Sequence, residues 1–173
     1  MSTPETKQDP TFLAYVYQLN EGLELKEALA LSLQAIDDLD IDQLKRIGLK
    51  TYEEGKWTVP TILQHLIDWE RIWGFRAIIF ARGEGTIPVA HDQEIMGQNS
   101  NADELPIEQL VNELRIVRQS TLMMFESFNE KILETSCKFF EYEMPLSAIG
   151  LTITAHQIHH FNVIKERYVP LDG

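Results

Sequence analysis

Histidines are concentrated near the end of the chain, where three of the five lie within five residues of one another. His156 and His160 are four residues apart, so on a helix their side chains share one face, with Cβ atoms about 6 Å from each other. Two imidazoles in this arrangement can bind one metal ion. A pair at this spacing also occurs by chance on a buried helix face, so the pair alone leaves both interpretations open.

A third histidine is expected to face the same core from an earlier helix. The residues from Trp57 to Ala81 predict this helix, because Thr58 is a good N-cap and Pro60 falls in the first turn, where proline is tolerated. At about 100° per residue, His65 lies within one broad apolar arc. The apolar members of that arc are Ile62, Leu66, Trp69, Ile72, Trp73, Ile79 and Phe80. A single histidine in this setting is more often a core residue hydrogen-bonded to a neighbour.

The three histidines together favour a metal site. Each buried imidazole needs a polar partner, and the flanking positions are mostly aliphatic or tryptophan. One ion bound by His65, His156 and His160 would satisfy all three. Three protein ligands with an open fourth position are typical of catalytic rather than structural zinc. Imidazoles suit zinc, nickel, copper and iron alike, and we expect one divalent ion per chain, with zinc or nickel preferred.

Other charged residues are predicted to lie close to these histidines. Asp68, at the edge of the same arc, is the candidate for a catalytic base. Arg76 and Arg167 fall on the inward arcs of their helices, where each could pair with an acidic neighbour such as Asp68 or Glu70 or could bind an anionic group of a substrate. His159 lies at the margin of its arc and is less suited to be a ligand.

The helices that carry these residues are expected to form a bundle. Apolar residues recur at spacings of three and four in four long segments, and we find no convincing alternating strands, apart from a short extended piece at 137–142. The helical segments are about 23–39, 58–81, 107–128 and 145–168. They predict an all-α, antiparallel four-helix bundle with one or two long crossover connections, the polar stretch 83–106 being the longest connection. We expect one domain, 1–173, with residues 1–10 flexible.

Composition narrows the classes of partner. The formal net charge is −12 and lysine and arginine form no run, which argues against nucleic acid as a partner. No apolar segment approaches the ~20 residues of a membrane span, and the first residues lack the apolar core of a signal peptide. With one cysteine, Cys137, the chain fits a reducing compartment, so we expect a cytoplasmic protein. Leu151, Ile158 and Phe161 form a second apolar stripe on the last helix and predict a homodimer.

Three segments, in this order, resemble proteins of the DinB/YfiT-like family. Residues 55–83 resemble the second-helix signature of the family, residues 87–94 its Pro-Gly-Phe-Asp stretch, and residues 155–168 its Gly-His-x-x-His-His ending. Ala155 stands where glycine is common and His91 where an aromatic residue is common. The resemblance implies a four-helix bundle and a divalent metal ion held by His65, His156 and His160, the same residues that the spacing indicates.

The resemblance also implies candidate activities. Relatives include transferases that use low-molecular-weight thiols such as bacillithiol or mycothiol, and a thiol-dependent isomerase. Our first hypothesis is therefore a metal-dependent transferase, in which such a thiol, held on the metal as the thiolate, attacks an electrophilic substrate. A metal-dependent hydrolase and a non-catalytic, dimeric stress-response or metal-binding module are the alternatives, so the sequence leaves open whether the protein is an enzyme.

Overall fold

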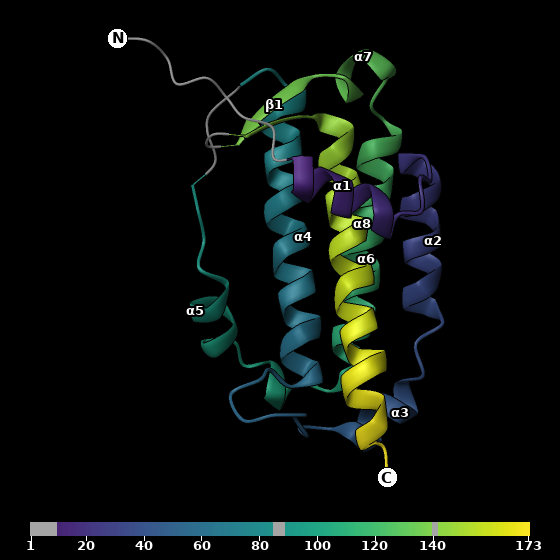
Figure 1. Ribbon diagram of the computed structural model, residues 1–173, viewed down its shortest axis with the longest axis vertical. Helices are drawn as coiled ribbons and strands as arrows, with labels where there is room; N and C mark the ends of the chain where they lie inside the picture. The colour runs from purple at the N-terminus through teal and green to yellow at the C-terminus, as the bar shows by residue number, and fades with distance from the viewer. Residues whose placement is uncertain (1–9, 85–88, 140–141) are drawn as a thin grey trace.

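A computed structural model describes residues 10–84, 89–139 and 142–173, and it confirms a bundle of four long helices (Figure 1). These helices are α2 (Leu25–Asp37), α4 (Val59–Ala81), α6 (Ile107–Glu126) and α8 (Leu146–Val163). Helices α2 and α4 each pack against both α6 and α8, so the two pairs α2/α4 and α6/α8 lie across the diagonals of the bundle.

The direction of the helices shows which connection is the crossover. Helices α2 and α8 run downward in Figure 1, whereas α4 and α6 run upward. The pairs α2/α6 and α4/α8 are therefore antiparallel, and the pairs α4/α6 and α2/α8 are parallel. A parallel pair requires a connection that returns along the bundle, and this is the predicted long connection between α4 and α6, which contains α5 (Gln93–Gln98) and the 3₁₀ turn η1 (Ala102–Glu104).

The residues at the start of α4, the helix that carries His65, fix where this helix begins. The Thr58 side chain caps α4 by accepting a hydrogen bond from the backbone N–H of Thr61 at 3.2 Å, and its hydroxyl donates to Asp103 of η1 at 2.5 Å. Pro60 lies in the first turn, as predicted. The cap therefore fixes the start of α4 and at the same time attaches the end of the long connection to it.

The smaller elements close the two ends of the bundle. Helix α1 (Pro10–Leu19) packs on α8, and α3 (Ile41–Ile47) stops at Gly48, where φ is +59°. Helix α7 (Glu130–Leu133) precedes an antiparallel hairpin of β1 (Ser136–Phe139) and β2 (Tyr142–Pro145), in which Cys137 lies opposite Met144. The extended piece expected at 137–142 is thus one strand and the beginning of a second.

A buried polar layer divides the core in two. Apolar clusters lie above and below it, one around Leu29, Phe125 and Ile149 and the other around Leu63 and Leu110. The layer takes one residue from each long helix: Ser32, Glu70, Arg118 and Gln157. Arg118 donates to both carboxylate oxygens of Glu70 at 2.8 and 2.9 Å and also to the hydroxyl of Ser32, and the Gln157 amide donates to the Ser32 carbonyl at 2.8 Å.

The second apolar stripe of α8 is partly covered by the chain itself. Leu151 is buried in the first apolar cluster, while Ile158 and Phe161 line a cavity of about 240 Å³ beside α2. The stripe is therefore a weaker argument for self-association than the sequence suggested, and the homodimer stays a prediction. Among the described helices, none combines the length and the apolarity that crossing a membrane requires.

Candidate metal centre

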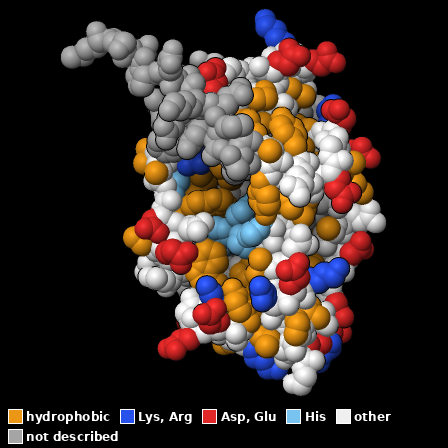
Figure 2. Space-filling view, viewed as in Figure 1, with side chains coloured by type: hydrophobic (Ala, Val, Ile, Leu, Met, Phe, Trp, Pro, Cys, Tyr) orange, Lys and Arg blue, Asp and Glu red, His pale blue; other side chains and the backbone are white. Residues whose placement is uncertain are grey.

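The structure brings together the three histidines that the sequence singled out. His65 comes from α4, and His156 and His160 come from successive turns of α8. The Nε2 atom of His156 lies 2.9 Å from Nε2 of His65 and 3.1 Å from Nε2 of His160, and the three ligand atoms all fall within 4.8 Å of one another. Figure 2 shows histidine side chains at a hollow in this face of the molecule, among apolar side chains.

The donor set itself fits a metal ion. A ring nitrogen of a neutral imidazole carries either one hydrogen or one lone pair in the ring plane, so Nε2 of His156 cannot serve both of its close neighbours as a hydrogen-bond partner. A cation between the rings would instead accept one lone pair from each. His65, His156 and His160 are therefore the residues that could hold a divalent ion, and the fourth position would face solvent or substrate.

Burial keeps all three imidazoles neutral, which is the form that binds metals. It lowers the pKa of His65 to about 4 and, with the charges of His65 and His159, the pKa of His160 to about 3. The pKa of His156 is lowered well below the ordinary value, first by burial and then by the charges of His160 and His65. At neutral pH no proton has to leave the cluster before a metal ion can enter.

Two indoles enclose His65. The ring of Trp69 stacks against it at 5.3 Å between centroids, and the ring of Trp57 lies at 4.8 Å. The hydroxyl of Tyr168 donates to the backbone carbonyl of Trp57, which holds this residue at the end of the bundle. Gly97 of α5 lies against the Trp57 indole so closely that a Cβ atom there would be 2.9 Å from its Cε2 atom. Helix α5 is thereby seated on the residue that covers His65.

A cavity of about 440 Å³ opens beside His156 and His160. Its walls come from the loop before α4, from α5 and from the last turns of the chain, and they offer both polar and apolar groups. Besides the two histidines, it is lined by Tyr52, Gly55, Lys56, Trp57, Ile62, Gln93, Glu94, His159, Val163 and Tyr168. A small molecule in this cavity would contact the open side of the three-imidazole cluster.

Asp68 does not line this cavity. Its carboxylate accepts a hydrogen bond from the Gln64 side chain at 2.9 Å, and its charged neighbours are Arg71 and Glu113, so it faces the side of α4 that meets α6. Burial raises the pKa of Asp68, which the Gln64 hydrogen bond and Arg71 partly oppose. The expected catalytic base is therefore not among the residues that line the cavity beside His156 and His160, and its role in catalysis stays a prediction.

Arg76 is buried, as its inward arc predicted, and its contacts attach the long connection to α4. Its Nη2 atom donates to the Val89 carbonyl at 2.9 Å, and its guanidinium lies over the ring of Trp73 at 4.9 Å. Burial lowers the pKa of Arg76. Glu70, one of the two partners considered for Arg76 from the sequence, is bound by Arg118 through both carboxylate oxygens.

Arg167 faces solvent, so the prediction that it lies on the inward arc was wrong. The last helix does not continue as a regular α-helix but changes to a π-helix at Ile164–Tyr168. A π-turn contains one extra residue, so every later side chain moves round the axis by one position. Tyr168 is consequently buried where Arg167 was expected, and the guanidinium of Arg167 lies 6.0 Å from the ring of Tyr52.

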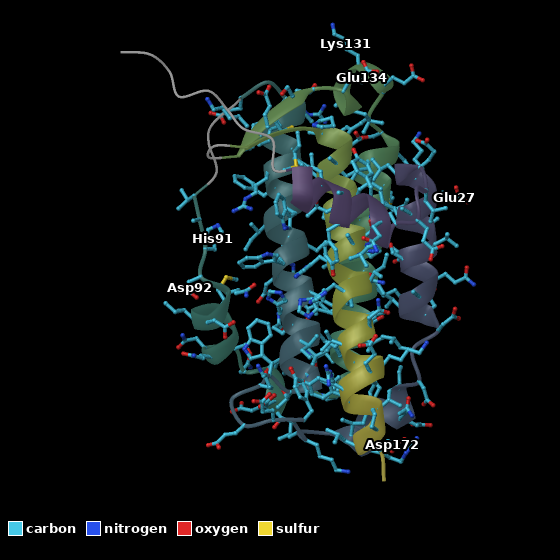
Figure 3. All side chains as sticks on the ribbon, in the orientation of Figure 1. Glu27, His91, Asp92, Lys131, Glu134 and Asp172 are labelled. Carbon is cyan, nitrogen blue, oxygen red and sulfur yellow. The ribbon has the colours of Figure 1, made fainter. Side chains whose placement is uncertain are left out.

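The remaining two histidines lie at the edge of the site. His159 is exposed, as its marginal position predicted, and its Nδ1 atom lies 2.9 Å from the hydroxyl of Tyr15 on α1. His91 and Asp92 lie on the connection that leads into α5, outside α4 (Figure 3). The His91 ring is 6.4 Å from Trp69, and Asp92 caps α5 by accepting from the backbone N–H groups of Glu94 and Ile95.

Arg118 is a buried charged residue of this region that was not predicted from the sequence. It is 1% exposed, and its charge contributes to the low pKa of His156. The spacing contained the signal, because Leu114, Arg118 and Thr121 lie four and three residues apart on the inward face of α6. The role of Tyr15 had no comparable signal, since its partner His159 is 144 residues away.

A four-helix bundle with a three-imidazole centre in its core defines the class of this protein. Residues 24–164 match the family model of the DinB superfamily, and the chain belongs to that superfamily. None of the curated proteins compared with the chain matches it. Among solved structures, it is similar to YfiT from Bacillus subtilis, described as a probable metal-dependent hydrolase with an unusual four-helix bundle topology. The two structures have a TM-score of 0.62 and 16% sequence identity, and the likeness covers 96% of this chain and 93% of YfiT. It shows that the two chains share a fold.

Proposed function

We propose that this protein is a metal-dependent hydrolase, with one divalent ion, zinc or nickel, held by His65, His156 and His160. The observation that carries the proposal is the convergence of three imidazoles beside a cavity of about 440 Å³. The description of YfiT as a probable metal-dependent hydrolase supports it, because the two folds are similar over most of both chains. Asp68 does not line this cavity, so its part in catalysis stays a prediction that the proposal does not require.

The ligands are held by the packing of the bundle. When bound, a divalent ion at three imidazoles lowers the pKa of water and polarises a carbonyl oxygen. His156 and His160 are fixed relative to each other by the helix, and His65 is fixed between two indoles on the antiparallel neighbour. Trp57 and Trp69 border His65, and the cavity of about 440 Å³ opens beside His156 and His160.

The cavity wall can position a polar substrate. Lys56 offers a cation, Glu94 an anion, and Tyr52 and Gln93 neutral hydrogen-bonding groups. These residues lie on the loop before α4 and on α5, both of which are attached to the bundle near Trp57. A substrate held there would present a hydrolysable carbonyl to the three histidines.

A thiol-dependent transferase is the second candidate, and the size of the cavity favours it. A volume of about 440 Å³ would accommodate a low-molecular-weight thiol. Lys56 and Glu94 would then contact the carboxylate and the amine of such a thiol. In this reaction the sulfur bonds to the electrophile, the leaving group departs, and the thiol proton is released to solvent.

Metal analysis of untagged protein is the first test. We expect about one ion per chain, and a large loss in His65→Ala and in His160→Ala. His159→Ala is the matched control, because it removes an imidazole from the same turn of α8 without removing a proposed ligand. Full metal content in His65→Ala or His160→Ala would overturn the ligand assignment, and loss of metal in His159→Ala would extend it.

Activity assays then separate the candidate functions. Metal-loaded protein is incubated with a panel of esters, amides and electrophiles, with and without added thiols. Metal-dependent turnover without a thiol supports the hydrolase, and turnover that requires a thiol supports the transferase. The absence of any rate above that of the metal-free control, although one ion is bound, would favour a non-catalytic metal-binding module.

A further inference from the structure

A second cavity, of about 230 Å³, shares His156 and His159 with the larger one. It lies where α1 crosses α4 and α8, and its other walls come from all three helices. These wall residues are Tyr15, Val16, Trp69, Trp73, Thr152 and Ala155. The histidine cluster therefore lies between two spaces, one bordered by mixed groups and the other bordered mainly by aromatic and aliphatic side chains.

The two hydroxyl groups that line the smaller cavity are already engaged in hydrogen bonds. The Thr152 hydroxyl donates to the Ala148 carbonyl at 2.7 Å, and the Tyr15 hydroxyl lies 2.9 Å from Nδ1 of His159. Such a space makes little demand for hydrogen bonds, so water gains little by occupying it. An apolar group entering it would exchange contact with water for contact with two indoles.

The aromatic walls are held in place before any ligand arrives. Trp69 stacks on His65 at 5.3 Å, and Trp73 lies under the guanidinium of Arg76 at 4.9 Å. Arg76 is in turn attached to the Val89 carbonyl. A preformed cavity costs little conformational entropy to fill, which favours binding. The size is also adequate, since an apolar cavity of about 150 Å³ suffices to bind benzene.

We propose that this cavity is a subsite for an aromatic or branched aliphatic group of the substrate. The substrate would then have three parts: an apolar group between Trp69 and Trp73, a hydrolysable or electrophilic centre at the histidines, and a polar remainder in the larger cavity. Esters and amides of arylacetic acids are the simplest compounds with this plan. The inference rests on the proposed function in one respect, namely that the reacting centre lies at His65, His156 and His160.

Paired chelating ligands test the subsite by binding alone. Calorimetric titration of the metal-loaded protein compares acetohydroxamate with phenylacetohydroxamate, which differ only by the phenyl group. We expect the phenyl compound to bind at least about tenfold more tightly, because it buries an additional apolar surface of phenyl size. The variant Ala155→Leu fills the cavity and should reduce the preference to within about twofold, with metal content and acetohydroxamate affinity retained.

The matched control makes the same substitution in another cavity. Ala35 lines the cavity of about 240 Å³ beside α2, so Ala35→Leu adds the same atoms to a space of similar size and should keep the phenyl preference. An equal loss in Ala35→Leu would overturn the proposal, and so would an equal affinity of the wild type for the two hydroxamates. In that last case normal acetohydroxamate binding would leave the proposed function intact.

Two further measurements keep the test decisive. If the protein binds no metal, the proposed function fails, but the subsite can still be tested. Phenylacetamide and acetamide are then compared on the metal-free protein. Only phenylacetamide should bind, and Ala155→Leu should abolish that binding. If Ala155→Leu does not fold, Trp73→Leu replaces it. Removal of this indole wall should weaken the binding of the phenyl compound severalfold and leave the affinity for acetohydroxamate unchanged. Unchanged phenyl binding in the folded variant would refute the subsite.

Discussion

The Nε2 atoms of His65 and His156, which are 91 residues apart in the chain, lie 2.9 Å from each other across the interface between α4 and α8. The pKa of both imidazoles is lowered, chiefly by burial, so both rings are neutral at neutral pH, and two ring nitrogens at this distance either share one hydrogen or bind a common cation. The stability of the bundle therefore depends on pH, which protonates these rings, and on a metal ion that would bind both of them.

The metal-free protein should lose stability as the pH falls below 6.5. Burial lowers the pKa of His65 from its ordinary 6.5 to about 4, so between these values the unfolded chain binds a proton that the folded chain does not. The contribution of His65 is therefore complete above pH 6.5 and is lost as the pH falls toward 4, by roughly 2–3 kcal/mol. Urea unfolding at several pH values measures it, and His65→Leu should show a shallower slope than the wild type. Equal slopes would mean that His65 titrates normally.

Metal binding should quench tryptophan fluorescence. The chain has three tryptophans, and Trp57 and Trp69 both border His65, at 4.8 and 5.3 Å between ring centroids. Titration with Ni²⁺ or Cu²⁺ should therefore quench the emission until one equivalent has been added, whereas His160→Ala should show much weaker quenching at the same concentrations. Quenching that continues well beyond one equivalent, or that is unchanged in His160→Ala, would place the ion elsewhere.

Regular helices explain why much of the site could be predicted. The rule of about 100° per residue correctly placed His65 inward, because α4 is a regular α-helix from Val59 to Ala81. The same rule correctly placed His156 and His160 on one face, because α8 is regular through Val163. The same rule failed at Arg167, where the chain changes to a π-helix and the angle per residue no longer holds.

Contacts between distant segments explain what could not be predicted. The attachment of Arg76 to the Val89 carbonyl and the approach of Gly97 to Trp57 depend on how the long connection folds back, and periodicity carries no information about this. Arg118 is a different case, because its position on the inward face of α6 was readable. A buried arginine is not expected from the sequence, because burying a charge is costly unless a partner such as Glu70 lies opposite.

Breaking that buried ion pair should be costly. Arg118 and Glu70 are 1% and 2% exposed, so Arg118→Met leaves a carboxylate without a partner in the core and should reduce the free energy of unfolding by about 3–5 kcal/mol. The double variant Glu70→Leu/Arg118→Met removes both charges and should recover much of this loss. Chemical denaturation of the two single variants and the double variant measures the coupling. Additive losses in the double variant would show that the pair is not coupled.

Two glycine-to-alanine substitutions should change stability in opposite directions. At Gly97, a Cβ atom would come within 2.9 Å of the Trp57 indole, so Gly97→Ala must displace either α5 or the ring that covers His65. At Gly74, inside α4, the nearest side-chain atom would be 4.0 Å away, so the new methyl group fits.

Gly74→Ala should therefore stabilise the protein by about 0.5–1 kcal/mol, the usual gain from replacing glycine within a helix. Gly97→Ala should destabilise it by about 1–3 kcal/mol, as overpacking does, and should weaken metal binding because Trp57 can no longer cover His65. Thermal unfolding of the two variants, with and without metal, tests both statements. A stable Gly97→Ala with unchanged metal affinity would show that α5 can move away from Trp57 without disturbing the histidines.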